Sequence, residues 1–175
     1  MLNDLSSQVF LNALLVLGLA AAVIIDLRSR RIPNLVTAPI ALLGVVANVW
    51  GSGWSGLSNS LGGLLLGMVL LMPVWLNGGT GAGDVKLMGM VGALQGPQFA
   101  LWTALFGAVA GGIFALAALA WRGGTAQVLR NVGASIYRMA AAGSLGRVEP
   151  TSQSFRMSYA LAIALGAAAA YWYLR

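Results

Sequence analysis

Two aspartates stand out in a chain that is otherwise almost free of acid. Its 175 residues include only four acidic ones: Asp4, Asp26, Asp84 and Glu149. Asp26 closes the first long apolar run, and Asp84 ends a glycine cluster (GGTGAGD) that opens another apolar stretch. Carboxylates are costly near hydrocarbon and usually mark a functional site there. The pattern therefore predicts a carboxylate pair.

Other catalytic and metal-binding chemistries are restricted by composition. The chain contains no cysteine and no histidine. This excludes disulfides, thiolate metal sites, cysteine nucleophiles, Ser-His triads and histidine-based zinc sites. The groups left for acid–base work are the carboxylates, the single lysine Lys86, four tyrosines and the hydroxyl side chains. We expect neither a metal nor a cofactor.

Two carboxylates held close together at a membrane boundary have a specific chemistry. They cannot both ionise comfortably in a low dielectric, so the pair shares one proton. The ionised member can take a proton from water while the neutral member donates a hydrogen bond to a scissile carbonyl. This is the chemistry of an aspartic peptidase, and it requires no histidine, cysteine or metal.

Each aspartate also has a plain structural interpretation. Asp84 begins a predicted helix, where an aspartate is often a simple cap. Asp26 lies four residues before Arg30 and could form an ordinary helical ion pair with it. The glycines before Asp84, including Gly81 and Gly83, would let an extended substrate approach the backbone closely.

The elements that must position these residues are transmembrane helices. The chain is 59% hydrophobic and only 8% charged, with a mean hydropathy of +0.84, which a soluble domain could not sustain. We therefore predict one all-α membrane domain, 1–175, built as a six-helix bundle. The predicted spans are 8–26, 35–50, 57–76, 84–97, 98–121 and 155–174, with a turn at GSGWSG. The fourth is short for a span and is expected to be kinked or partly buried.

Glycine pairs (Gly63 and Gly67; Gly107 and Gly111) suit close helix packing, although membrane helices are glycine-rich in any case.

The basic residues predict the orientation of this bundle. With six spans, nine of the ten basic residues fall on one side, and only Arg175 falls on the other. The positive-inside rule places that side, including the segment 122–154, in the cytoplasm and both termini outside. Asp26 and Asp84 then share the cytoplasmic side. An amphipathic helix at 125–143 is expected on the cytoplasmic interface. Because the arginines are dispersed in short loops, they indicate contact with lipid headgroups rather than nucleic acid.

The residues around both aspartates carry a family resemblance. The segment Asp26-Leu-Arg-Ser-Arg-Arg-Ile-Pro-Asn34 and the segment Gly81-Ala-Gly83-Asp84-Val-Lys86 resemble the two aspartate motifs of type IV prepilin peptidases. The resemblance implies a bacterial inner-membrane enzyme that cleaves the basic leader of prepilins at the cytoplasmic face. It implies that Asp26 and Asp84 are catalytic. Supporting or substrate-orienting roles would fall to Gly81, Gly83, Lys86, Arg30, Pro33 and Asn34. Lys86 would position phosphate headgroups or tune the carboxylates.

One departure from the larger family members is informative. Those members carry paired Cys-x-x-Cys motifs in an amino-terminal segment and also methylate the new amino terminus. This chain has no cysteine and begins directly with its first span. It therefore resembles the short, peptidase-only branch of the CpaA/TadV type, which processes Flp (Tad) pilins, and we predict no methyltransferase activity. The sequence does not indicate the oligomeric state.

Three rival functions are weighed against this one. Intramembrane proteases of the presenilin kind share Gly-x-Gly-Asp but use nine spans and a Tyr-Asp motif, whereas Ile25 precedes Asp26. A small transporter or proton relay would use Asp26 and Asp84 near mid-membrane, whereas both are predicted at helix ends. An inactive scaffold of pilus assembly would not need both aspartates.

Overall fold

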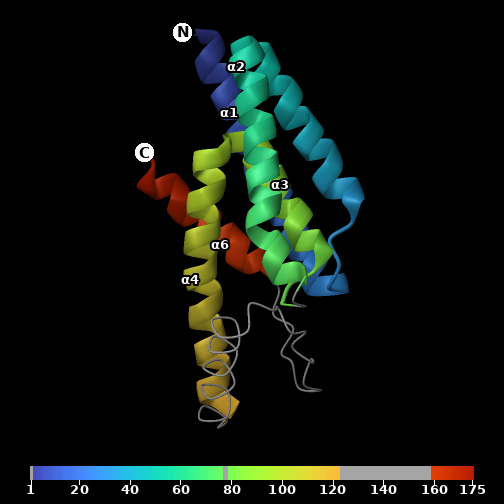
Figure 1. Ribbon diagram of the computed structural model, residues 1–175, viewed down its shortest axis with the longest axis vertical. Helices are drawn as coiled ribbons and strands as arrows, with labels where there is room; N and C mark the ends of the chain where they lie inside the picture. Colours follow the sequence, from blue (N-terminus) through green and yellow to red (C-terminus); the bar gives the residue numbers. More distant parts are fainter. Residues whose placement is uncertain (1, 77–78, 123–158) are drawn as a thin grey trace.

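The computed structural model describes residues 2–76, 79–122 and 159–175, and this part of the chain is built from helices (Figure 1). They are α1 (Leu2–Ser29), α2 (Asn34–Leu76), α3 (Ala82–Gln95), α4 (Pro97–Arg122) and α6 (Tyr159–Tyr173). Within these residues, three helices are long and apolar enough to cross a membrane, in α1, α2 and α4. The all-helical prediction is confirmed for the described residues. The amphipathic helix predicted at 125–143 lies outside them.

Helix α2 is a hairpin of two arms. Its backbone leaves helical geometry at Gly53, with φ 58° and ψ −131°, a left-handed conformation that favours glycine. The arms, 34–52 and 54–76, lie side by side (Figure 1). A Cβ at Gly56 would overlap the carbonyl of Asn48, so the arms can come this close only with glycine at that position. The predicted turn at GSGWSG is confirmed, and the arms correspond to the spans predicted at 35–50 and 57–76.

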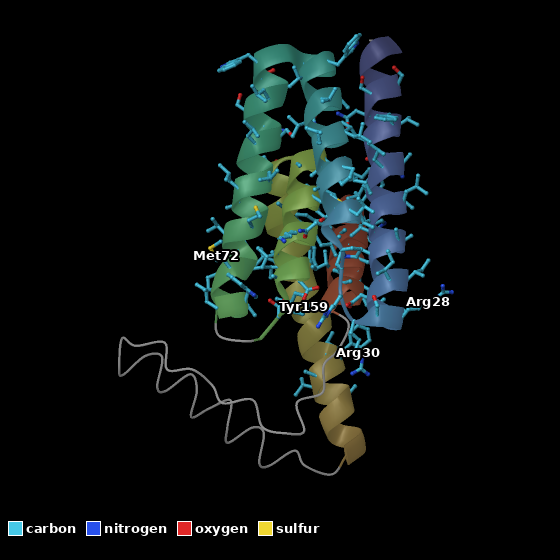
Figure 2. The ribbon with its side chains drawn as sticks, turned by 90° about the vertical axis from the view of Figure 1, so that its right-hand side faces the viewer. Arg28, Arg30, Met72 and Tyr159 are labelled. Carbon is cyan, nitrogen blue, oxygen red and sulfur yellow. The ribbon has the colours of Figure 1, made fainter. Side chains whose placement is uncertain are left out.

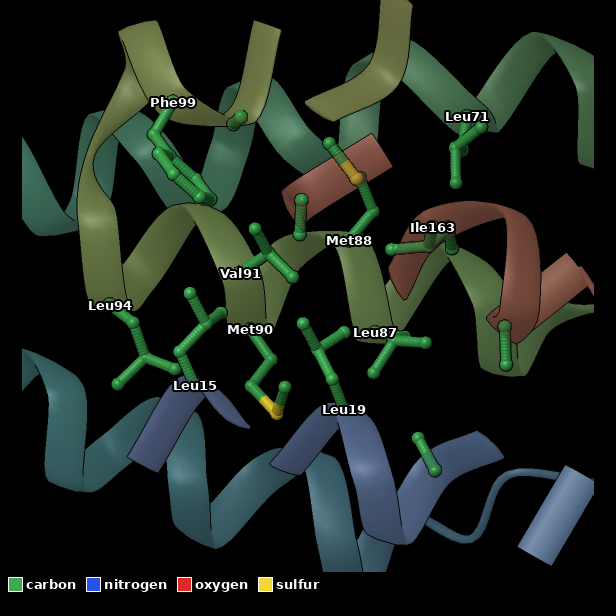
Figure 3. Close-up of a cluster of buried hydrophobic side chains, with 14 of the residues drawn as sticks. Leu15, Leu19, Leu71, Leu87, Met88, Met90, Val91, Leu94, Phe99 and Ile163 are labelled. Atoms are coloured by element: carbon green, nitrogen blue, oxygen red, sulfur yellow. The ribbon is translucent and has the colours of Figure 1, made fainter. Parts of the chain in front are cut away.

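Helix α3 forms the core of the bundle. Its 14 residues extend over about 21 Å, too little to cross a hydrocarbon layer of about 30 Å. Figure 3 shows its side chains packed against Leu15 and Leu19 of α1, Phe99 of α4 and Ile163 of α6. Ten of its residues are buried, on all sides of the helix. The helix predicted at 84–97 begins at Ala82 and ends at Gln95, and the expectation that it is partly buried is confirmed. The six-span count stays a prediction, because three helices of the described residues are long enough to span a membrane by themselves.

Glycines allow α2 and α3 to touch through their backbones. A Cβ at Gly63 would overlap the carbonyl of Gly92, and a Cβ at Gly92 would overlap the carbonyl of Gly63. Gly67 lies equally close to the carbonyl of Met88. The packing role predicted for Gly63 and Gly67 is confirmed. Gly107 lies against Ala162 of α6, where a Cβ would stand 3.3 Å from the Ala162 carbonyl oxygen.

The carboxyl end of α3 is buried and has its carbonyl groups satisfied by α2. The Asn48 amide of the first arm donates to the carbonyls of Ala93 and Leu94, at 3.2 Å each. The Ser60 hydroxyl of the second arm also donates to the Ala93 carbonyl. The last carbonyls of a helix lack partners within it, and water is excluded inside a membrane bundle. These polar side chains therefore hold the end of α3 inside the hairpin.

Candidate active site

Asp26 lies in the last turns of α1, just before the chain turns towards α2. Helix α1 ends at Ser29, and Arg30 follows in the left-handed region with φ 52°. The Arg30 N–H donates to the Asp26 carbonyl at 2.8 Å, the backbone bond of an αL helix end. Arg30 therefore stands beyond the helix, and its recorded contact with Asp26 is through the backbone rather than through a helical ion pair. Figure 2 shows Arg28 and Arg30 at this end of the bundle.

The rest of the first aspartate motif forms the turn into α2. Ile32 is buried, and Pro33 immediately precedes Asn34, the first residue of α2. Pro33 and Asn34 therefore open the second helix. Ile32 packs on Gly83, where a Cβ would come within 3.0 Å of the Ile32 Cβ and 3.3 Å of its backbone. Glycine at position 83 thus allows the two motifs to meet this closely, and a larger residue there would push Ile32 away by a few tenths of an ångström.

Asp84 lies in the first turn of α3 and is 8% exposed. Its Oδ2 accepts a hydrogen bond from the Gly81 N–H at 2.9 Å. In return, the Asp84 N–H donates to the Gly81 carbonyl at 3.0 Å. The Asp84 carboxylate therefore does cap its own helix. It does so from the third residue of the helix, whereas the sequence suggested that Asp84 is the first. The capping bond engages Oδ2 and leaves the other carboxylate oxygen free of that role.

The electrostatic environment of Asp84 links it to Asp26. Asp84 lies outside the three helices long enough to span a membrane. Burial raises the pKa of Asp84 from 3.8 to about 6; the Gly81 N–H opposes this rise, and the charge of Asp26 adds to it. Like charges disfavour joint ionisation when they lie close together. The carboxyl groups of Asp26 and Asp84, 58 positions apart in the sequence, therefore act on each other at one end of the bundle.

A second polar contact joins the two motifs. The Lys86 ammonium donates to the Asn34 side-chain carbonyl at 2.7 Å, across 52 positions of sequence. Both residues are exposed. The described residues of the two aspartate motifs therefore meet at Ile32 with Gly83 and at Asn34 with Lys86.

Comparison with known proteins agrees with this arrangement. The model of the type IV leader peptidase family matches residues 13–116, which include both aspartates and the whole of α3. The chain belongs to the type IV leader peptidase family. The match begins within α1 and ends within α4, so the family region is the part of the chain that carries the two motifs and the helices holding them.

Curated relatives within the leader peptidase family are about one third identical to this chain. The prepilin leader peptidase/N-methyltransferase of Pseudomonas aeruginosa is 34% identical over 116 residues, covering 62% of this chain and 40% of that protein. The protein of the same name from Burkholderia pseudomallei is 34% identical over 122 residues, covering 63% and 39%. The chain thus spans about two fifths of the length of these relatives. No solved structure matches it.

The structure adds a residue to the site of this leader peptidase family member that the sequence did not indicate. Burial raises the pKa of Tyr159, the first residue of α6, and the charge of Asp84 adds to this rise. Figure 2 shows Tyr159 at the same end of the bundle as Arg30. Nothing local distinguishes Tyr159 from the other three tyrosines in the sequence. Its place beside the site comes from how α6 packs.

The bundle also contains a cavity of about 240 Å³ at its other end. Its lining includes Asn12, Gln95 and Arg175 but neither aspartate, and the Gln95 amide donates to the Asn12 side chain at 2.8 Å. Asn12 lies 14 residues before Asp26 along α1, about 21 Å of helix. The cavity is therefore separate from the candidate active site.

Proposed function

We propose that this chain is a membrane aspartic endopeptidase that cleaves the leader peptide of type IV prepilins, with Asp26 and Asp84 as its catalytic pair. The observation that carries the proposal is that the two aspartate motifs meet, Ile32 with Gly83 and Asn34 with Lys86, in a member of the type IV leader peptidase family. The two carboxylates come from different helices that are joined at one end of the bundle, and the charge of Asp26 adds to the rise in the pKa of Asp84. This is the arrangement that a proton-sharing pair requires.

Distinct roles for the two carboxyl groups are part of the proposal. Asp84 is the buried member with the raised pKa, so it holds the shared proton and donates a hydrogen bond to the scissile carbonyl oxygen. Asp26, half-buried at the end of α1, accepts a proton from the attacking water, whose oxygen bonds to the carbonyl carbon. That proton then passes to the leaving amine as the peptide C–N bond breaks. The Gly81 N–H fixes the Asp84 carboxyl through Oδ2, so the proton is placed on the opposite oxygen.

We expect cleavage to lose rate as pH rises through the pKa of Asp84. Its pKa in the folded protein is raised to about 6, so the carboxyl is protonated below that pH and ionised above it. The protonated form is the active one, and kcat/KM reports ionisation of the free enzyme. Initial rates on a prepilin between pH 4.5 and 8 should give a kcat/KM that falls above about pH 6. A profile that is level from pH 5 to 8 would contradict this assignment of the proton.

The orientation that we propose places the site at the cytoplasmic face. Support comes from the distribution of basic residues, nine of which share one side of the predicted six-span topology. A basic leader that remains in the cytoplasm would then reach Asp26 and Asp84 without crossing the membrane. Fusions of alkaline phosphatase within 122–154 should be inactive and fusions of green fluorescent protein there should fluoresce. The reverse result would overturn the orientation.

We further propose that the substrate is a Flp (Tad)-type prepilin and that this chain does not methylate the product. The proposal is supported by the absence of cysteine from the sequence, because the methylating family members carry paired Cys-x-x-Cys motifs. Co-expression with a Flp-type prepilin, followed by mass spectrometry of the pilin, should give a shortened chain without an added methyl group. An uncut Flp-type prepilin would refute the proposed substrate class, and a methylated amino terminus would refute the absence of methylation.

A further inference from the structure

Lys86 and Asn34 make the polar side-chain contact that joins the two aspartate motifs. Lys86 follows Asp84 by two residues, and Asn34 is the first residue of α2. From their hydrogen bond of 2.7 Å we infer that Lys86 is a positioning residue: it ties the amino end of α3 to the start of α2 and so holds Asp84 opposite Asp26. The inference rests on the proposed peptidase function and gives Lys86 a task within it.

The two ends of α3 are held in different ways, which explains why a tether is needed. The carboxyl end is buried, with Asn48 and Ser60 bonded to its carbonyls and Gly92 against the backbone of Gly63. The amino end follows a glycine-rich loop. It is fixed to the first motif by the packing of Ile32 on Gly83 and by the Lys86 bond.

Asn34 is a suitable anchor because it is close in the chain to Asp26. Eight positions separate the two residues, and the turn between them is fixed by the backbone bond of Arg30 to Asp26 and by the burial of Ile32. A displacement of the amino end of α3 away from Asn34 therefore displaces Asp84 from Asp26. A misplacement of about 1 Å can lower a reaction rate by about 100-fold.

The position of Lys86 on its helix argues against direct electrostatic tuning of Asp84. Side chains two positions apart on a helix do not face each other. The groups that act on the Asp84 carboxyl are the Gly81 N–H and Asp26. A neutral replacement of Lys86 should therefore lower the rate without moving the pH profile, whereas a tuning role would move it.

Because Lys86 and Asn34 are both exposed, their hydrogen bond should affect the cleavage rate rather than the stability of the fold. Exposed hydrogen bonds contribute little to stability because water replaces them. Lys86→Met and Asn34→Ala should therefore keep a melting temperature close to that of the unmodified protein. We expect each to lower kcat by about 10- to 100-fold with KM within about twofold, because a positioning residue acts on the placement of Asp84 rather than on binding.

The decisive measurement is a double-mutant cycle on cleavage of a Flp-type prepilin in detergent micelles. If the two side chains act through one bond, Lys86→Met with Asn34→Ala should be no slower than either single variant. Lys86→Arg, which keeps a donor, should recover most of the rate. Arg28→Met removes an exposed positive charge at the same end of the bundle and should retain full activity. If the rate losses of the two single variants multiplied in the double variant, or if KM rose, the inference that Lys86 acts as a tether would be wrong.

A second readout does not depend on activity. Hydrogen–deuterium exchange of the backbone amides at 81–85 should be faster in Lys86→Met and in Asn34→Ala than in the unmodified protein, while exchange at 91–94 should not change. Unchanged exchange at 81–85 would overturn the tether. If the unmodified protein failed to cut any prepilin, the proposed function would fall, and the exchange data would still decide whether Lys86 holds α3.

Discussion

Replacing Asp26 or Asp84 by asparagine is expected to lower leader cleavage by about 10²- to 10⁴-fold, the contribution of general acid–base catalysis. Asparagine keeps the size of the side chain and can still accept the Gly81 hydrogen bond, so the helix cap at Asp84 survives. It can neither take a proton from water nor share one with the other carboxyl group. The measurement is the initial rate of prepilin cleavage by purified protein.

The control for this loss is the same substitution elsewhere on α1. Asp4→Asn lies near the opposite end of α1 from Asp26 and should leave cleavage unchanged. The double variant Asp26→Asn with Asp84→Asn should be about as slow as either single variant, because residues that act as one unit do not lose rate independently. Near-normal cleavage by either single variant would rule out the aspartic mechanism.

Substitution of Gly92 by alanine should strongly destabilise the bundle. The new Cβ would overlap the Gly63 carbonyl, and a backbone carbonyl cannot move away by changing rotamer. Overpacking of this kind costs about 1–3 kcal/mol. A thermal unfolding curve in detergent should show a clearly lower midpoint for Gly92→Ala and, for the reciprocal reason, for Gly63→Ala.

Gly62, the neighbour of Gly63, provides a control in which the unfolding temperature should not fall. A Cβ at Gly62 meets nothing within 4 Å, and alanine is favoured over glycine inside a helix by about 1 kcal/mol. Gly62→Ala should therefore unfold at the same temperature or slightly higher. If Gly62→Ala and Gly63→Ala had equal effects, the close contact between the backbones of α2 and α3 would be wrong.

Local features of the fold could be predicted because they depend on short-range chemistry. The turn at GSGWSG follows from glycines that accept a positive φ, as Gly53 does. The start of α2 at Asn34 follows from Pro33, which is suited to precede a helix. The sequence also indicated that Asp26 and Asp84 belong to one site. The influence of the Asp26 charge on the pKa of Asp84 agrees with this, and their catalytic role stays a prediction until the variants are measured.

The role of α3 could not be read from its own residues. A run of Leu, Met and Val suits a helix surrounded by lipid as well as one surrounded by other helices. Only its length was informative, and the burial came from tertiary packing. The contact of Lys86 with Asn34 and the approach of Tyr159 to Asp84 were also hidden, because they join residues far apart in sequence. Asn48 and Ser60 did give a signal, as polar residues within apolar runs, but not their partners.

The hairpin of α2 has a consequence for how the protein assembles. Asp26 precedes the start of the hairpin and Asp84 follows its end, so folding of the hairpin at Gly53 brings both ends to the same place. Bringing Asp26 and Asp84 together closes a loop of the chain, which costs conformational entropy. The contacts within the α2 hairpin reduce the length of chain that remains to be closed. Both aspartates and the helices that carry them lie within the first 95 residues. The carboxylate pair can therefore form during synthesis, before α4 and α6 emerge from the ribosome.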